Sequence, residues 1–355
     1  MLFTEFNNYS IEGMSIAAPA FITGVESFND TFGADVVENI SAMTGIKSFR
    51  RTPPEQTASD LGYVAARELL DRSSVNQEEI GLLIYVTQKP DYRIPSTAYV
   101  LQKRLRIGND CSCFDINLAC SGFVYGLHTA MSMLNFSDKK FALVITGDTT
   151  TKTISPYDRT MMLLFGDSGT ATLIRKSNVS TKSYTALRTD GKRFKAIITP
   201  SGAYRNLEGS KERVLWSDEI VRSDYDTHMK GMDVFGFSIS DVPKLMKEFM
   251  EQLGTTPENY DCFALHQPNL YMLKKIAHKI KIPKEKLLVS IDRFGNNSSS
   301  SIPLVLADHY GDTKSGLIKA FMCGFGSGLS WGCADVNIDV KNILPIIYTD
   351  EFFEE

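Results

Sequence analysis

The sequence lacks any apolar run long enough to span a bilayer, and its first residues, Met1-Leu2-Phe3, lack the basic-then-apolar order of a secretory signal. We therefore expect a cytoplasmic protein that is not inserted in a membrane. Long blocks of one charge sign are also missing, since 38 basic and 42 acidic residues give a net charge of -4. This balance gives no indication of nucleic acid as a partner.

Cysteine is scarce as well, with six residues in 355. In a cytoplasmic protein we expect these cysteines to be reduced. The pair Cys111-Ser112-Cys113 lacks the second pair of ligands that a zinc site needs, and the glycine-rich turn around Phe325 has neither of the patterns that bind nucleotide phosphates. We expect neither a metal nor a nucleotide cofactor.

What the chain does contain is enough apolar sequence for a large core, with 43% hydrophobic and 23% charged residues. Helix-like and strand-like segments alternate in two similar series. The strand-like run 141–145 matches 317–321, and the passage from strand to helix at Cys120 has a later counterpart at Asn296, in each case about 180 residues on. This order predicts a duplicated α/β unit with mixed sheets and helices on their faces.

The duplication predicts four segments. An N-terminal half over 1–176 carries Cys120, and a C-terminal half over 219–340 carries the later motifs. Between them, 177–218 is polar, with only short apolar runs, and is expected to be an irregular insertion. Residues 341–355 are expected to form an acidic tail.

Cys120 is the most informative residue, because it follows the strand-like run 113–117 and precedes a helical pattern. A thiol at such a junction faces unpaired backbone N–H groups and the positive end of the helix dipole, which both favour the thiolate. A free cysteine is, however, more often a small buried hydrophobe. Whether Cys120 is a nucleophile or a buried core residue therefore depends on the rest of the chain.

Three later segments bear on it: His266-Gln267-Pro268-Asn269, Gly295-Asn296-Asn297-Ser298, and the glycine-rich turn Gly324-Phe325-Gly326-Ser327-Gly328-Leu329-Ser330-Trp331-Gly332. Alone, the histidine is more often a core residue and the asparagine a turn residue. With Asp115-Ile116-Asn117-Leu118-Ala119-Cys120-Ser121-Gly122-Phe123, the four motifs in this order resemble the beta-ketoacyl-acyl carrier protein synthase III group of the thiolase-like superfamily. The resemblance runs from about Ile46 to Ala334.

The resemblance implies a thiolase-like duplicated five-layered α-β-α-β-α fold. It implies that Cys120 takes an acyl group from a thioester, and that His266 and Asn296 donate hydrogen bonds to the enolate formed when malonyl-acyl carrier protein loses carbon dioxide. The product is a 3-oxoacyl thioester. Coenzyme A or phosphopantetheine enters as part of the substrate, so no separate cofactor is expected.

Other site residues follow from the same resemblance. The backbone N–H groups of Cys120 and Ser327 are expected to form the oxyanion hole, with Phe325 and Gly326 in the pocket. Ser327 is a departure, because the family usually has three consecutive glycines there. Ile94 is expected to reach across the interface of a homodimer and cap the neighbour's acyl pocket.

Arg159 and Asn269 match positions that bind the acyl donor or its pantetheine arm, although Arg159 is equally well explained as an exposed partner of Asp158. The family's Trp and Arg contacts to coenzyme A correspond here to about Asn39 and to Met43. Their loss suggests a donor carried on acyl carrier protein, whose acidic surface fits Lys274 and Lys275. A solvated helix face explains these lysines nearly as well.

Three alternatives stay open. An acyltransferase of the same fold would pass the acyl group to a hydroxyl or amine without decarboxylation. A thiolase would need a second cysteine as base, and Cys323 lies one residue from the appropriate place. A non-catalytic partner subunit would be expected to lack the thiol.

Overall fold

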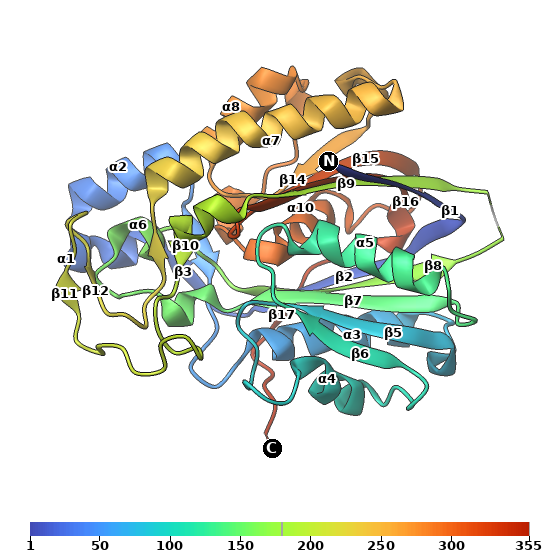
Figure 1. Ribbon diagram of the computed structural model, residues 1–355, viewed down its shortest axis with the longest axis horizontal. Coiled ribbons are helices and arrows are strands. Elements are labelled where there is room, and N and C mark those ends of the chain that lie inside the picture. Colours follow the sequence, from blue (N-terminus) through green and yellow to red (C-terminus); the bar gives the residue numbers. More distant parts are fainter. Residues whose placement is uncertain (179, 355) are drawn as a thin grey trace.

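The computed structural model describes residues 1–178 and 180–354, which fold as alternating layers of helix and sheet (Figure 1). One sheet has the order β1 (Leu2–Asn7), β9 (Lys182–Thr189), β16 (Ser330–Asp339), β15 (Leu317–Gly326) and β14 (Cys262–Leu265). The other has the order β17 (Ile347–Thr349), β2 (Tyr9–Pro19), β8 (Ser168–Lys176), β7 (Phe141–Asp148), β5 (Ile80–Val86) and β6 (Ser112–Ile116). Both sheets mix parallel and antiparallel pairs.

Helices occupy the three remaining layers, as Figure 1 shows. The outer helices over the first sheet are α7 (Gly231–Leu253) and α8 (Leu270–Ile280), and those over the second are α3 (Ala58–Arg72) and α4 (Thr97–Leu105). Helices α5 (Gly122–Leu134) and α10 (Ser301–Tyr310) lie between the sheets. The predicted α-β-α-β-α fold is confirmed.

Smaller elements gather at the left of Figure 1, beyond the sheets. They are the short helices α1 (Asn29–Phe32), α2 (Ala34–Thr44), α6 (Arg159–Met162) and α9 (Ile291–Phe294), and the ribbons β3–β4 (Ile22–Gly24, Ser48–Arg50), β10–β13 (Ile197–Ile198, His228–Met229) and β11–β12 (Val214–Leu215, Val221–Arg222). Of the helices described, none is long and apolar enough to cross a membrane.

The two sheets repeat one topology. The neighbours β2-β8-β7-β5 correspond to β9-β16-β15-β14, with the same parallel and antiparallel pairings in both sets. Within each series an outer helix, α3 or α7, follows the first strand, and a central helix, α5 or α10, precedes the third. The duplication therefore brings the two central helices, and the junctions that lead into them, side by side.

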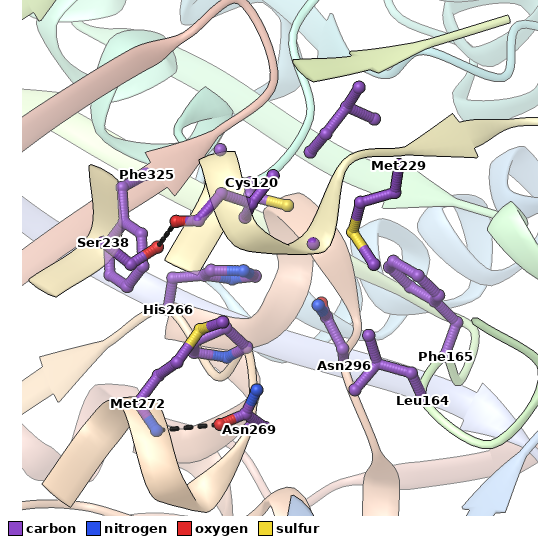
Figure 2. A pocket seen from close by; sticks show the side chains of 15 residues that line it. Cys120, Leu164, Phe165, Met229, Ser238, His266, Asn269, Met272, Asn296 and Phe325 are labelled. Atoms are coloured by element: carbon purple, nitrogen blue, oxygen red, sulfur yellow. Dashed lines mark hydrogen bonds between the residues drawn. The ribbon is translucent and has the colours of Figure 1, made fainter. Parts of the chain in front are cut away.

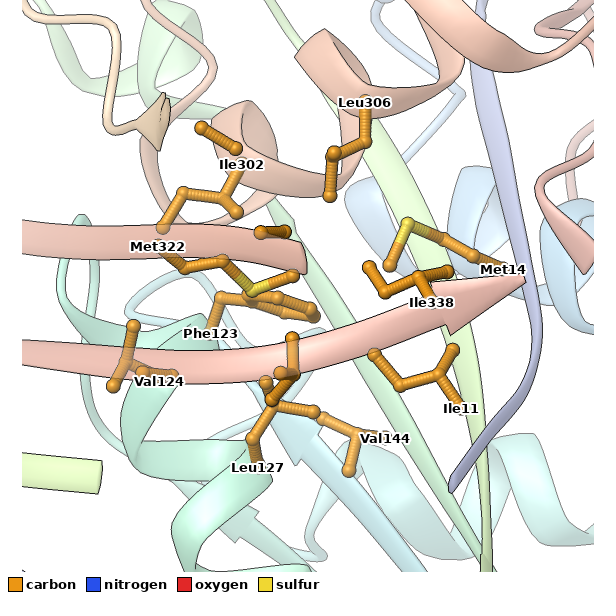
Figure 3. Close-up of a cluster of buried hydrophobic side chains, with 14 of the residues drawn as sticks. Ile11, Met14, Phe123, Val124, Leu127, Val144, Ile302, Leu306, Met322 and Ile338 are labelled. Atoms are coloured by element: carbon orange, nitrogen blue, oxygen red, sulfur yellow. The ribbon is translucent and has the colours of Figure 1, made fainter. Parts of the chain in front are cut away.

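The central layer is apolar because α5 and α10 are covered on both sides. Figure 3 shows Phe123 and Leu127 of α5 near Ile302 and Leu306 of α10, in one cluster with strand residues such as Met322. Each such side chain contributes about 1.5–3 kcal/mol on full burial. The core thus fixes the start of α5, next to Cys120, relative to the start of α10.

The structure corrects the prediction that 177–218 is irregular throughout. Strand β9 (Lys182–Thr189) lies inside the first sheet, paired with β1 on one side and β16 on the other. It is the first strand of the second repeat. The short elements after it, over 190–230, form an extension beside the sheets.

The acidic tail contains ordered structure. Strand β17 (Ile347–Thr349) adds in parallel to β2, and the guanidinium of Arg67 pairs with the carboxylate of Glu351 at 2.8 Å. Gln56 Nε2 donates to the backbone oxygens of Thr349 and Glu351. Residues 347–351 are thereby held against the second sheet and α3.

Candidate active site

Cys120 lies where the sequence places it, between β6 and α5, with Ser121 at the N-cap position of the helix. Burial nevertheless raises the pKa of its thiol to about 12, the Ser298 hydroxyl opposes this shift, and the Asp148 carboxylate adds to it. Burial therefore outweighs the thiolate-favouring junction. The resting group is a thiol, which needs a base to become a nucleophile.

His266 directly follows β14, and its backbone N–H donates to the oxygen of Cys323 at 2.8 Å. Its Nδ1 lies 2.7 Å from Ser301 Oγ, and that hydroxyl donates to the oxygen of Ser298 at 2.6 Å. Because a hydroxyl has one hydrogen, Nδ1 must be the donor to Ser301. Nε2 is then left as a proton acceptor.

The ring is neutral in this state, since burial lowers the pKa of His266 to about 3. His266 is only 2% exposed, and its ring lies nearly perpendicular to that of Phe325, with ring centroids 5.2 Å apart. A neutral imidazole with a free Nε2 can take a proton from a neighbour.

Asn296 is held by its own backbone and by Ser298. Its N–H donates to Leu164 at 2.9 Å, its carbonyl accepts from Gly166 at 3.1 Å, and its Oδ1 accepts from the Ser298 N–H at 2.9 Å. With Oδ1 engaged, Nδ2 is the group left to donate. Gly295, at φ +66°, turns the chain into this position, where a Cβ would lie 2.8 Å from the Leu164 oxygen.

The structure brings Cys120, His266 and Asn296 to the wall of one pocket with about 530 Å³ of empty space. In Figure 2 their side chains surround a common space. The same pocket is lined by three further residues expected from the sequence, Phe325, Gly326 and Asn269. The rest of the wall is mostly apolar: Leu164, Phe165, Ile197, Met229, Val234, Pro268 and Met272.

Gly326 lies against the cysteine, since a Cβ there would fall 2.6 Å from Cys120 Cβ and 3.0 Å from Sγ. The next residue, Ser327, is not one of the five described non-glycine residues with positive φ. The serine is therefore accommodated without backbone strain. Its hydroxyl donates to Gln88 Oε1 at 3.1 Å, away from the first pocket.

A second pocket, with about 450 Å³ of empty space, adjoins the first at Cys120, Phe165, Ile197 and Met229. Its wall is much richer in polar residues: Gln88, Lys89, Asp148, Thr150, Thr227, Ser298 and Ser327. Of these residues, only Ser327 was expected at the site from the sequence. They lie on separate segments, and the fold alone brings them together.

Asp148 lies at the base of this polar wall and is buried. Its Oδ1 accepts from Thr87 Oγ1 at 3.1 Å and from the Gln88 N–H at 2.8 Å, while Oδ2 accepts from Ser298 Oγ at 2.6 Å. Ser298 Oγ is also 3.9 Å from Cys120 Sγ. The carboxylate therefore reaches the sulfur through one serine.

Other expected residues lie outside the two pockets. Arg159 begins α6 and lines neither pocket, and the neighbouring Asp158 pairs with the buried Arg222 at 2.8 Å instead. Ile94 is 79% exposed.

Helix α8 begins at the first pocket and carries the two lysines that were expected to bind acyl carrier protein. Asn269 caps the helix by accepting from the Met272 N–H at 2.8 Å, and both residues line the pocket. Lys274 and Lys275, on the same helix, are exposed. Across residues 1–178 and 180–354, no group of three or more His, Cys, Asp or Glu side chains is arranged to hold a metal ion.

Family models and relatives agree with this geometry. A model described as 3-oxoacyl-[acyl-carrier-protein (ACP)] synthase III matches 114–191, and the model of that enzyme's C-terminal part matches 250–338. A putative 3-oxoacyl-[acyl-carrier-protein] synthase 3 of Campylobacter jejuni is 31% identical over 98% of this chain and 99% of its own. A beta-ketoacyl-[acyl-carrier-protein] synthase III of Xanthomonas campestris is 33% identical over 84% and 88%.

A crystal structure of a 3-oxoacyl-(acyl-carrier protein) synthase from Burkholderia xenovorans superposes with a TM-score of 0.92. It is 33% identical, and the match covers 98% of this chain and 99% of that one. The matched segments include the junction at Cys120 and the strands that carry His266 and Gly326. The chain belongs to the 3-oxoacyl-[acyl-carrier-protein] synthase III family of condensing enzymes with the thiolase fold.

Proposed function

We propose that Cys120, His266 and Asn296 are the catalytic residues of a beta-ketoacyl synthase that condenses an acyl group with malonyl-acyl carrier protein. One observation carries the proposal: three side chains from distant segments line one mostly apolar pocket. They present a thiol, a neutral imidazole with a free Nε2, and a carboxamide Nδ2. These are the groups that acyl transfer and enolate stabilisation need.

In the first step, His266 Nε2 takes the proton from the Cys120 thiol as the sulfur attacks the carbonyl carbon of the acyl donor. The backbone N–H groups of Cys120 and Ser327 hold the oxyanion. The intermediate expels the donor's thiolate, which takes the proton from His266 and leaves as a thiol. Cys120 then carries the acyl group as a thioester, and His266 is neutral again.

In the second step, malonyl-acyl carrier protein binds with its thioester oxygen at His266 and Asn296. One proton from solvent goes onto His266 Nε2, because the negative charge that develops nearby favours the imidazolium. Loss of carbon dioxide leaves an enolate held by Nε2–H and Nδ2–H. Its carbon attacks the acyl thioester, Cys120 departs as a thiolate, and the imidazolium proton restores the thiol.

The partners in this proposal are acyl and malonyl thioesters and an acyl carrier protein, in agreement with the names of the relatives. Phosphopantetheine enters only as the substrate's arm, and the protein needs no further cofactor. Lys274 and Lys275 are exposed on α8, the helix that begins at the pocket, where an acidic carrier could dock. We further propose a cytoplasmic homodimer in which Ile94 of each subunit caps the other's acyl pocket.

Mass spectrometry tests the reaction. The protein is incubated with an acyl-carrier thioester, malonyl-carrier protein is added, and both the Cys120 adduct and carbon dioxide are measured. We expect an adduct that disappears as carbon dioxide and a 3-oxoacyl product form. Cys120→Ala should give neither the adduct nor the 3-oxoacyl product. An adduct passed to a hydroxyl or amine without carbon dioxide would establish the acyltransferase alternative, and no adduct would support a non-catalytic subunit.

The donor carrier can be tested in the same assay. Met43 stands where the family has a coenzyme A contact, and its side chain is 58% exposed. We propose that the acyl group arrives on carrier protein and not on coenzyme A. Acylation of Cys120 should be faster from the carrier-protein thioester than from the coenzyme A ester of the same acyl group, and the opposite order would refute this.

A further inference from the structure

The two pockets that meet at Cys120 cannot serve the same substrate in the condensation step. His266 and Asn296 line the first pocket and are absent from the wall of the second. If they hold the malonyl thioester, as proposed above, the first pocket is occupied when the carbon–carbon bond forms. The acyl chain already attached to Cys120 must then lie in the second pocket.

The second pocket has an unusual wall for an acyl chain, because it contains a lysine. Lys89 lines it, and no hydrogen bond or ion pair of its ammonium occurs within the described chain. Burial lowers the pKa of Lys89 and the Asp148 carboxylate opposes this shift, but the two oxygens of that carboxylate already accept from Thr87, Gln88 and Ser298. The ammonium therefore has donors to spare for a ligand.

The rest of the polar wall is held in place. Gln88 Oε1 accepts from Ser327, at the position where the family usually has glycine, and Thr227 Oγ1 lies within 3.3 Å of the Thr153 hydroxyl and 3.2 Å of the Thr199 hydroxyl. The departure at Ser327 thus contributes to the second pocket by fixing Gln88. An unsubstituted alkyl chain would offer the Lys89 ammonium no hydrogen-bond acceptor, whereas an oxygen substituent on the chain would offer one.

We propose that the second pocket selects a short acyl group with an oxygen substituent, a hydroxyl or a carboxylate, on its third or fourth carbon, and that Lys89 donates to that oxygen. The inference rests on the proposed function, since it assigns the acyl chain of that reaction to this pocket. It adds the chemical class of the acyl substrate and one residue that determines specificity.

The test compares three acyl groups of four carbons, butyryl, 3-hydroxybutyryl and succinyl, each as a thioester of the same carrier protein. The rate of adduct formation at Cys120 is measured by mass spectrometry. We expect the wild type to react at least about tenfold faster with one of the oxygenated groups than with butyryl, since 1.4 kcal/mol corresponds to a factor of ten. Lys89→Met should reduce that ratio at least about fivefold.

A second variant, Lys89→Gln, distinguishes the two oxygen sources. It keeps a donor without a charge, so a preference for 3-hydroxybutyryl should persist, whereas a preference for succinyl should be lost. Lys103→Met is the matched control, because Lys103 is an exposed lysine of α4 that lines neither pocket. In Lys103→Met, the ratio of the acylation rate with the oxygenated group to that with butyryl should equal the wild-type ratio.

The outcomes separate the two proposals. Faster acylation by butyryl, or a ratio that Lys89→Met leaves unchanged, overturns the selectivity while the condensing function stands. If no thioester acylates Cys120 and malonyl-carrier protein loses no carbon dioxide, the proposed function fails, and this inference with it.

Discussion

The hydroxyl of Ser298 donates a hydrogen bond of 2.6 Å to Oδ2 of Asp148, a buried carboxylate from the other half of the fold. The same serine supports the rest of the site. Its N–H holds Asn296 Oδ1, and its carbonyl accepts from the hydroxyl that positions His266. Ser298 has φ +50°, a strained angle for a residue with a Cβ, which fits a residue fixed by contacts on all sides.

Replacing Ser298 by Ala tests the side-chain part of this support. The variant keeps both backbone contacts but removes the donor to Asp148, so we expect a loss of about 1–3 kcal/mol in the free energy of unfolding. The hydroxyl also lowers the pKa of the Cys120 thiol, so alkylation of Cys120 should slow.

Ser299→Ala is the matched control, since Ser299 Oγ lies 3.4 Å from the same carboxylate oxygen. Denaturant unfolding and iodoacetamide labelling followed by peptide mass spectrometry give both readouts. Equal effects of the two substitutions would contradict the central position of Ser298.

The thiol pKa predicts a specific pH profile. Only the thiolate reacts with iodoacetamide, and burial raises the pKa of Cys120 to about 12. Below that pKa the thiolate fraction rises tenfold per pH unit, so the labelling rate should rise in the same proportion from about pH 7 to 10. A plateau near neutral pH would mean that the helix N-terminus outweighs burial.

Local signals in the sequence indicated the three proposed catalytic residues because each lies at a junction between elements of secondary structure. Cys120 precedes α5 and His266 directly follows β14, but Asn296 follows the short helix α9 and the turn at Gly295, where the sequence predicted a strand. Such junctions are readable from apolar runs and small residues. Their meeting in one pocket followed from the family resemblance and the duplicated order of elements.

Long-range properties were harder to predict. Strand β9 was missed because polar residues such as Lys182 and Arg188 alternate with its buried ones, and the flanking segment after it is polar too. The thiol pKa was predicted with the wrong sign, because the junction is local whereas burial depends on the whole fold. No sequence motif links Lys89 with Asp148.

Gly326 is predicted to tolerate no side chain. In Gly326→Ala the new Cβ would lie 2.6 Å from Cys120 Cβ, so either the cysteine or the end of β15 must move. A displacement of about 1 Å at a reacting group can cost about 100-fold in rate. We expect a loss of this size in Cys120 acylation, measured by the rate of adduct formation.

Gly236→Ala is its control, because Gly236 lies in α7 with open space around it. There alanine should stabilise the helix by about 0.5–1 kcal/mol and leave acylation unchanged. Wild-type acylation in Gly326→Ala would show that the turn is not held against the cysteine.

His266 and Asn296 are predicted to differ in the step that each supports. Asn296 offers only Nδ2 to the pocket, so Asn296→Ala should lower decarboxylation of malonyl-carrier protein by about 100- to 1,000-fold, as when one oxyanion donor is removed. It should leave acylation of Cys120 nearly intact.

His266→Ala should slow both steps. The thiol, with its pKa raised to about 12, loses the acceptor of its proton, and the enolate loses one of its two donors. Loss of a general base costs about 100- to 10,000-fold. His278→Ala, which removes an exposed histidine of α8, should change neither step.

Two measurements on Asn296→Ala, His266→Ala and His278→Ala check this difference between the steps. One is single-turnover acylation of Cys120, and the other is release of carbon dioxide from malonyl-carrier protein. If His266→Ala acylates Cys120 at the wild-type rate, Nε2 is not the acceptor of the thiol proton. The hydrogen-bond arrangement through Ser301 and Ser298 would then have to be reversed, so that the Ser301 hydroxyl donates to Nδ1 and the proton rests on Nε2 from the start.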